Sequence, residues 1–324
     1  MKCDVADIPK AEMHIHLEGA IRRDTYAELR KRDDPSFSWS SVPWYDDDYR
    51  FHDLGHFLDT AFFPVIRGLE DYKRIASELF EDLVAQNVVY AEVSLASSRI
   101  PIDEIADAVK SAKHDVCADS QLQVGILVGL FRSKSPEFAV RCVKKAVTSK
   151  RFGVVGVDLL DHETACKAAD FTEAFSLARE EGLGLRVHAG EGAGPESVWD
   201  AILSLDVSRV AHGVRAIEDP KLVNYLRETG ITLDLCPTSN VRVSIVDSIY
   251  AHPVRRFFDM GLKVTVSSDD PLIFNSDITS ELELLQNVFG FTPAELLQLT
   301  KNAIDGAFLS PENKRSIKKR LENF

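Results

Sequence analysis

The sequence predicts a closed barrel of eight parallel β-strands that alternate with helices. First, short apolar segments rich in β-branched residues alternate with longer amphipathic segments. Second, the apolar segments are nearly continuous, as in strands of a parallel sheet that helices cover. Third, eight such units are typical of a (β/α)8 TIM barrel. An open doubly wound sheet is the alternative, but its glycine-rich turn after the first strand is absent.

The expected strands and helices follow one another in a regular order along the chain. The strands are expected at residues 11–17, 88–95, 123–130, 154–160, 184–190, 209–214, 232–237 and 263–269. The helices between them are expected at Tyr72–Gln86, Ile102–Ala118, Pro136–Ser149, Thr164–Glu181, Ser197–Leu205, Pro220–Thr229 and Pro253–Gly261. The long connection at residues 18–87 predicts a helical excursion after the first strand, and further helices are expected at the C-terminus.

Composition and charge exclude several classes of function. The chain has 324 residues, of which 45% are hydrophobic and 27% are charged, which is ordinary for a globular protein. A net charge of −13 argues against nucleic acid as a partner. No 18-residue apolar run predicts a membrane span, and the first ten residues do not resemble a signal peptide. Five scattered cysteines without a C-x-x-C pair predict neither a disulfide framework nor a cysteine zinc finger, so a cytoplasmic location is expected.

Polar side chains follow four of the predicted strands, where a barrel collects its active-site residues. The first strand ends in His14-x-His16-x-Glu18, the fifth in His188-Ala-Gly-Glu191, the sixth in His212-Gly213 and the eighth in Ser268-Asp269-Asp270-Pro271. The other histidines fall in predicted loops or helices. We expect His52, His56, His114 and His252 to be structural or solvated, whereas His162 follows the fourth strand and fits either a pocket or a structural role.

His14 and His16 point to one face of their strand because residues two apart share a face. An isolated pair of this kind is more often solvated or hydrogen-bonded, so its meaning depends on the other strand ends. Three imidazoles and one carboxylate suit Zn²⁺ and leave a position for water. Zinc lowers the pKa of such a water from 15.7 to about 7, and a neighbouring acid or base must then move protons. Glu191 and His212 are the candidates for that work.

Five motifs along the chain resemble those of a known enzyme family. They are K-A-E-M-H-I-H-L-E-G-A-I, H-A-G-E, A-H-G-V-R-A-I-E-D-P, C-P-T-S-N-V and S-S-D-D-P-L-I-F. In this order they resemble the motifs of the adenosine deaminase family, a branch of the amidohydrolase superfamily, over about residues 8–310. The resemblance implies a single metal-dependent hydrolase barrel domain over residues 1–324, one zinc ion per chain and a small-molecule 6-aminopurine substrate. It does not predict an oligomeric state.

The resemblance also implies a role for each matching residue. His14, His16, His188 and Asp269 would bind the zinc. Glu191 would donate a proton to N1 of the purine ring, and His212 would orient and deprotonate the zinc-activated water. Asp269 is expected to serve in catalysis as well as in metal binding, and Asp270 would contact N7. Water would add to C6, and the 6-amino group would leave as ammonia.

Two departures from the family pattern concern the substituent on N9 of the purine. Glu18 stands where many adenosine deaminases have an aspartate that meets the ribose 5′-hydroxyl, and relatives that act on free adenine or larger nucleosides more often carry H-L-E-G. Asp161 replaces a glycine whose amide bonds N3, so its side chain should intrude on or line the sugar pocket. Phe62, in the aromatic excursion, is expected to line the same pocket, although packing of that segment onto the barrel is an equal alternative.

Several functions remain open from the sequence. Adenosine or 2′-deoxyadenosine is the first expected substrate, with another 6-aminopurine such as aminodeoxyfutalosine or free adenine as the alternative. A two-metal hydrolase is disfavoured because the fourth strand end lacks the lysine that such enzymes often need. A catalytically inactive barrel that acts as a binding module is disfavoured because the expected ligands, Glu191 and His212 are all present.

Overall fold

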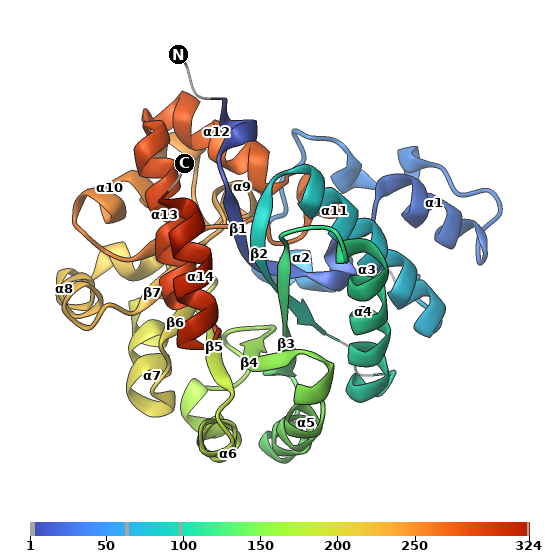
Figure 1. The fold of residues 1–324 in the computed structure, drawn as a ribbon, viewed down its shortest axis with the longest axis horizontal. Helices are drawn as coiled ribbons and strands as arrows, with labels where there is room; N and C mark the ends of the chain where they lie inside the picture. The colour runs from blue at the N-terminus through green and yellow to red at the C-terminus, as the bar shows by residue number, and fades with distance from the viewer. Residues whose placement is uncertain (1–3, 62–64, 97–98, 323) are drawn as a thin grey trace.

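The computed structural model describes residues 4–61, 65–96, 99–322 and 324. Within them, eight parallel strands form one sheet in the order β1 to β8, so each strand pairs with its neighbours in the sequence. The strands are β1 (Lys10–His16), β2 (Val88–Leu95), β3 (Gln123–Phe131), β4 (Val154–Leu160), β5 (Gly184–Ala189), β6 (Arg209–His212), β7 (Thr232–Leu235) and β8 (Val264–Val266). Figure 1 shows the helices around these strands, and the predicted (β/α)8 barrel is therefore confirmed.

The chain closes the barrel just beyond β8. Asp269 donates its backbone N–H to the carbonyl of His14 at 3.0 Å, and His16 donates its N–H to the carbonyl of Asp269 at 3.0 Å. Ile15 and Asp269 form an isolated parallel bridge at the same place. The sheet thus returns to β1 and leaves no open edge on this side.

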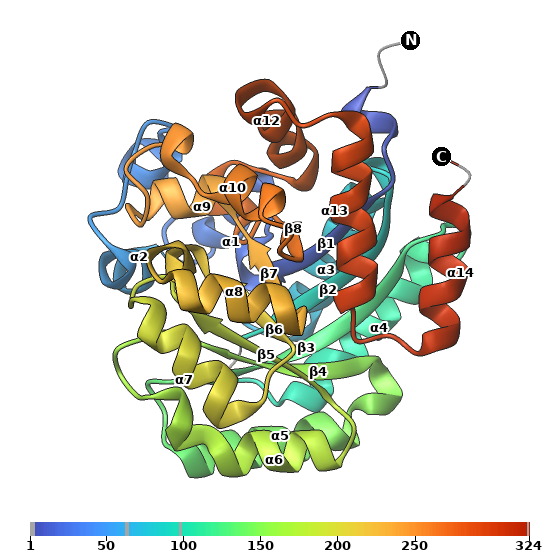
Figure 2. The same cartoon turned by 90° about the vertical axis from the view of Figure 1, so that its left-hand side faces the viewer.

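Helices cover the outside of the barrel in the described part of the chain (Figures 1 and 2). They are α1 (Arg23–Lys31), α2 (Leu54–Thr60), α3 (Leu69–Ala85), α4 (Ile102–Cys117), α5 (Pro136–Thr148), α6 (Thr172–Glu180), α7 (Pro195–Leu205), α8 (Pro220–Thr229), α9 (Pro237–Arg242), α10 (Val254–Asp259), α11 (Pro271–Phe274), α12 (Ile278–Phe289), α13 (Pro293–Gly306) and α14 (Pro311–Leu321). The last three are the expected C-terminal helices. No helix among the described residues is long and apolar enough to cross a membrane.

Some predicted elements end earlier than their apolar pattern does. Strand β7 stops at Leu235 because the next residues turn into α9, which begins at Pro237. Strand β8 stops at Val266, where the chain crosses towards β1. The helix predicted at Thr164–Glu181 is α6 alone, because a 3-10 turn at Ala168–Phe171 precedes it. Apolar runs that continue into loops are still buried, and sequence periodicity does not separate the two cases.

The excursion after β1 holds α1 and α2 and packs through aromatic rings. Tyr26 stacks on Trp39 with 5.5 Å between ring centroids. Phe57, on α2, lies 5.2 Å from the ring of Phe274 on α11. Such ring pairs contribute about 0.5–1.5 kcal/mol beyond the area that they bury. The excursion is therefore fastened to the barrel at its C-terminal end, where the predicted site lies.

The barrel interior below that end is charged rather than apolar. Arg186 of β5 contacts Asp158 of β4 at 2.7 Å, and Arg209 of β6 contacts Asp234 of β7 at 2.6 Å, with all four side chains fully buried. Buried ions are tolerated when every charge is paired and hydrogen-bonded. This network fixes strands β4 to β7 relative to one another directly beneath the strand ends.

Candidate active site

Four side chains converge where β1, β5 and β8 end. The Nε2 atom of His14 lies 3.2 Å from Nε2 of His16 and 3.0 Å from Nε2 of His188. The Oδ1 atom of Asp269 lies 3.3 Å from the Nε2 atoms of both His14 and His16. Zn–N bonds of about 2.0–2.1 Å place the donors of a tetrahedral site about 3.3–3.4 Å apart. The spacing and the donor types therefore fit one metal ion held by these residues.

Two residues of the site, Asp269 and His212, have a left-handed backbone conformation. Among non-glycine residues, Asp269 has a φ of +65° and His212 has a φ of +60°. The left-handed region costs such residues on the order of 1–3 kcal/mol, and the surrounding structure has to enforce it. His212 is the last residue of β6, and Asp269 lies three residues beyond the end of β8, so the left-handed conformation marks the turn at which the chain leaves each strand end.

Neighbouring groups fix the orientation of two predicted ligands. Asp158 Oδ1 lies 3.1 Å from Nδ1 of His188, which leaves Nε2 of that ring for a metal. Burial alone would raise the pKa of Asp158, but Arg186 and His188 hold it well below its usual range. Ser239, on α9, donates its hydroxyl to Oδ2 of Asp269 at 2.7 Å. Asp158 and Ser239 are partners that the sequence reasoning did not identify.

Glu191 and His212 lie beside the donor group and face each other. The Oε2 atom of Glu191 lies 3.4 Å from Nε2 of His212, and both side chains are buried. Burial, with the nearby carboxylates Asp269, Glu163 and Asp270, raises the pKa of Glu191 well above its ordinary value. Burial lowers the pKa of His212 to about 3. The raised pKa of Glu191 favours its protonated form and the lowered pKa of His212 favours the neutral imidazole, a combination that suits proton donation by the carboxyl.

Glu163 supports the loop that carries Glu191, and the sequence reasoning missed this residue. Its carboxylate accepts the backbone N–H groups of Gly190, of Glu191 at 3.1 Å and of Ala193 at 2.8 Å. Only the position of Glu163 within the L-D-H-E segment at the end of β4 gave a sequence signal. The side chain reaches from β4 to the β5 loop and fixes where Glu191 lies.

A cavity of about 1030 Å³ opens over the four-donor group and is lined by residues of the excursion and of the strand ends. Asp270 lines it, and its Oδ1 atom is buried without a hydrogen-bond partner among the described residues. Burial and the charge of Asp269 raise the pKa of Asp270 well above its ordinary value. A Cβ atom on Gly19 would lie 1.7 Å from Asp270 Oδ1, so only glycine leaves room for this carboxyl.

Glu18 lies in the same cavity and is held on two sides. Its Oε1 atom accepts the hydroxyl of Tyr72 at 3.0 Å and the backbone N–H of Ala96 at 3.1 Å. Burial raises its pKa above the ordinary value for a glutamate. The carboxyl group is therefore fixed towards the cavity rather than free to swing away.

Asp161 and His162 form another part of the cavity wall. Asp161 has a φ of +85°, a conformation that favours glycine. Its side chain accepts the backbone N–H of Ser133 at 3.2 Å and that of His162 at 2.8 Å. The side chain thus lines the cavity while bonded to its rim. His162 lines it too, with Nε2 3.5 Å from Oδ1 of Asp59. Phe62 lies outside the described residues.

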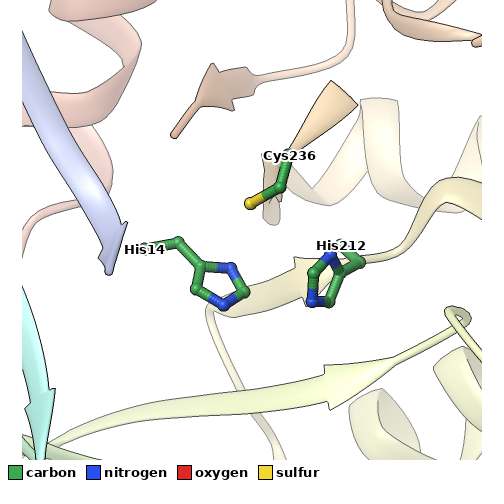
Figure 3. A group of neighbouring side chains, drawn as sticks. All are labelled: His14, His212 and Cys236. Carbon is green, nitrogen blue, oxygen red and sulfur yellow. The ribbon is translucent and has the colours of Figure 1, made fainter. Parts of the chain in front are cut away.

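Figure 3 shows Cys236 beside His14 and His212, with the sulfur directed towards His14. One potential ligand atom from each of these residues lies within 4.8 Å of the others. Cys236 is fully buried, and burial, with nearby acidic groups, raises the pKa of its thiol well above the ordinary value. A neutral thiol is a poor zinc ligand compared with the four-donor group described above.

Barrel architecture and a convergent histidine–carboxylate group at the strand ends define a metal-dependent hydrolase of the amidohydrolase type. Over residues 9–324 the chain matches the family profile described as adenosine deaminase. The chain belongs to the adenosine deaminase family. Its fold, its class as a deaminase-type hydrolase and the resemblance seen in its motifs are thereby confirmed.

Individual relatives differ in the substrate that their names state. An adenine deaminase from Rhizobium leguminosarum bv. trifolii is 32% identical, covering 97% of this chain and 99% of its own. An adenosine deaminase from Clostridium botulinum is also 32% identical, covering 96% of each chain. The crystal structure of an amidohydrolase from Burkholderia ambifaria with bound Zn superposes with a TM-score of 0.89 at 28% identity, covering 98% of this chain and 91% of its own.

Proposed function

We propose that this protein hydrolyses the C6–amino bond of a 6-aminopurine and releases ammonia. The observation that carries the proposal is the pairing of Glu191 with His212, 3.4 Å apart, at the edge of the four-donor group. A protonated carboxyl and an imidazole at that place can serve a ring nitrogen and a water molecule on the same side of a flat substrate. We also propose that residues 1–324 act as one hydrolase domain.

We propose zinc as the metal, held by His14, His16, His188 and Asp269. The donor set and spacing favour it, and so does the bound Zn in the amidohydrolase from Burkholderia ambifaria. Zinc bound there would lower the pKa of a water molecule to about 7 and so supply hydroxide at neutral pH. The ligand roles of these residues rest on geometry, which elemental analysis can test.

Each remaining residue then has a defined task. Glu191 gives its proton to N1, which withdraws electrons from C6 and prepares it for attack. His212 orients the attacking water. Asp270 contacts N7 through the carboxyl oxygen that has no partner among the described residues. Bond formation between oxygen and C6 is followed by protonation of the amino group, cleavage of the C6–N bond and departure of ammonia.

We propose free adenine as the preferred substrate because of Glu18. Adenine carries an N9–H that can donate to a carboxylate, whereas a nucleoside carries its sugar on that nitrogen. The side chain of Glu18 is one methylene longer than the aspartate at this position in many adenosine deaminases, and Tyr72 and Ala96 hold it in the cavity. The name of the Rhizobium relative also supports adenine.

Adenosine or 2′-deoxyadenosine is the second candidate, and the size of the cavity favours it. A volume of about 1030 Å³ leaves space for a sugar next to the purine ring. The Clostridium relative is named an adenosine deaminase at the same identity. A carboxylate at position 18 can accept a hydrogen bond from a sugar hydroxyl as well as from N9–H.

The experiment that tests the proposal is ammonia release from the zinc-loaded enzyme. The panel is adenine, adenosine, 2′-deoxyadenosine and aminodeoxyfutalosine at matched concentrations. We expect the highest kcat/KM on adenine and conversion to hypoxanthine. A higher kcat/KM on adenosine would overturn the choice of adenine, and no ammonia from any 6-aminopurine would overturn the proposed function and point to a binding module.

A further inference from the structure

His212, Asn240 and His252 form a row of three buried side chains that begins at the site. Asn240, on α9, places its Nδ2 atom 3.2 Å from Nδ1 of His212. On its other side, Asn240 Oδ1 lies 3.2 Å from Nε2 of His252. Asn240 is fully buried, and His252 is 3% exposed. Of the two expected roles of His252, structural or solvated, burial excludes the solvated one, and the contact with Asn240 links this histidine to the site.

The far end of the row determines where the proton of His252 lies. Val254, the first residue of α10, donates its backbone N–H to Nδ1 of His252 at 3.2 Å. A nitrogen that accepts this bond carries no proton, so a neutral His252 carries its proton on Nε2. Burial lowers the pKa of His252 to about 3, which keeps the ring neutral at ordinary pH. Its Nε2–H then donates to Asn240.

The orientation of the Asn240 amide then determines which ring nitrogen of His212 carries the proton. Because its oxygen accepts from His252, its nitrogen must face Nδ1 of His212, and an amide nitrogen can only donate. Rotating the amide by 180° would set its NH2 group against the Nε2–H of His252, two donors facing each other at a buried place. The backbone N–H of Val254 thus excludes the rotated amide, and Nδ1 of His212 accepts.

We propose that Asn240 and His252 are positioning residues that fix His212 as the tautomer with its proton on Nε2. This nitrogen lies 3.4 Å from Glu191 Oε2 and faces the site. His212 then offers a hydrogen bond to the attacking oxygen and orients it, but it has no lone pair at Nε2 for the proton of the water. Another group has to take that proton, and Asp269 is the carboxylate that belongs to the four-donor group. This consequence rests on the proposed function, whereas the tautomer does not.

The direct test is the ¹⁵N NMR spectrum of the histidine rings in the zinc-loaded enzyme, with the His212→Gln variant used to assign the signals. The two nitrogens of a neutral ring resonate far apart, and the protonated one couples to its hydrogen. We expect both His212 and His252 to carry the proton on Nε2. A proton on Nδ1 of His212 would overturn the proposal, whichever substrate the enzyme uses.

The variant Asn240→Asp tests the hydrogen-bonded row from His252 through Asn240 to His212, because a carboxylate has the same shape as the amide and can only accept hydrogen bonds. It would accept from Nε2 of His252 and from Nδ1 of His212, so the proton of His212 should move to Nδ1. We expect kcat to fall at least about 10²-fold while the zinc content and KM hold. Asn224→Asp, which adds the same charge on the exposed side of α8, is the control.

A spectrum that does not change in the folded Asn240→Asp variant, or a wild-type kcat, would contradict the proposal. If that variant does not fold, the spectrum of the unmodified enzyme still decides the tautomer. Absence of deaminase activity together with the expected tautomer would reject the proposed function but not the positioning role of Asn240 and His252.

Discussion

The carboxylate of Glu163 accepts the backbone N–H of Glu191 at 3.1 Å, and so it fixes the predicted proton donor from outside the reaction centre. The variant Glu163→Gln replaces an acceptor by an amide whose nitrogen would face N–H groups. Loss of one such buried bond costs about 1–3 kcal/mol, or about 5–150-fold in kcat. We expect that decrease at constant zinc content. Glu173→Gln, exposed on α6, is the control, and an unchanged kcat for Glu163→Gln would mean that this contact only stabilises the fold.

Metal removal should abolish activity. The four-donor group of His14, His16, His188 and Asp269 predicts about one zinc ion per chain by elemental analysis. Prolonged exchange against a strong chelator should remove both metal and activity, and added zinc should restore both. His188→Ala should lose most of the metal because one of the imidazole donors is gone. Two metal ions per chain, or full activity after chelation, would be incompatible with this site.

Activity should fall at alkaline pH. The pKa of Glu191 is raised by burial and by nearby carboxylates, so its protonated form persists above pH 4.5 and is lost as the pH rises through the raised value. The donor to N1 disappears in that range, and kcat decreases with it. His212, whose pKa is about 3, stays neutral above pH 5 and adds no change there.

The variant Glu191→Gln checks the origin of this alkaline decrease. It should lower kcat at least about 10²-fold and flatten the alkaline limb, since glutamine has no proton to lose. The exposed variant Glu312→Gln should keep the wild-type profile. A Glu191→Gln enzyme with the wild-type limb would assign the titration to another group.

Substrate choice should depend on Glu18 and Asp161. Shortening the fixed carboxylate in Glu18→Asp removes the partner of N9–H and opens space for a sugar, so the kcat/KM ratio should move from adenine towards adenosine. Asp161→Gly frees the cavity wall and should move it in the same direction. An unsatisfied buried polar group corresponds to about 5–150-fold in this ratio. An unchanged ratio in both folded, zinc-loaded variants would place selectivity elsewhere, for example in residues 43–66.

Cys236 should not bind the metal, although its sulfur lies near His14 and His212. The four proposed donors would hold zinc without the thiol, and burial raises the pKa of this thiol well above its ordinary value. Cys236→Ser should therefore keep about one zinc ion per chain. Loss of the metal from this variant, with the fold intact by circular dichroism, would make the thiol a ligand.

The barrel and the residues at its strand ends could be predicted from the sequence for one physical reason. Parallel strands with covering helices bring their carboxyl ends together, so His14, His188 and Asp269 had to converge even though they are far apart in the chain. Local pattern and chain order suffice for that conclusion. The ends of β7 and β8 could not be located in this way, because apolar character continues into buried loops.

The support around these residues was not predictable in the same way. His252 and Glu163 act through hydrogen bonds to groups from other segments, and those bonds depend on loop conformations that no local spacing encodes. Nothing in the sequence shows that His252 is buried while His52, on the excursion, is exposed. For a similar reason the sequence does not determine which substituent the purine substrate carries on N9. Glu18 takes its orientation from Tyr72 and Ala96, which lie far along the chain.

The bridge between Ile15 and Asp269 joins the final strand of the barrel to the first through the same peptide units that carry predicted ligands. A metal held by His14, His16 and Asp269 would therefore link β1 to the residues that follow β8. Its binding free energy would oppose separation of these two segments. Strand β8 spans only Val264–Val266 and can make few hydrogen bonds to its neighbours, so the metal would add stability at this end of the sheet. Closure of the barrel and binding of the metal would then be cooperative. The metal-free chain would unfold more easily than the metal-bound chain.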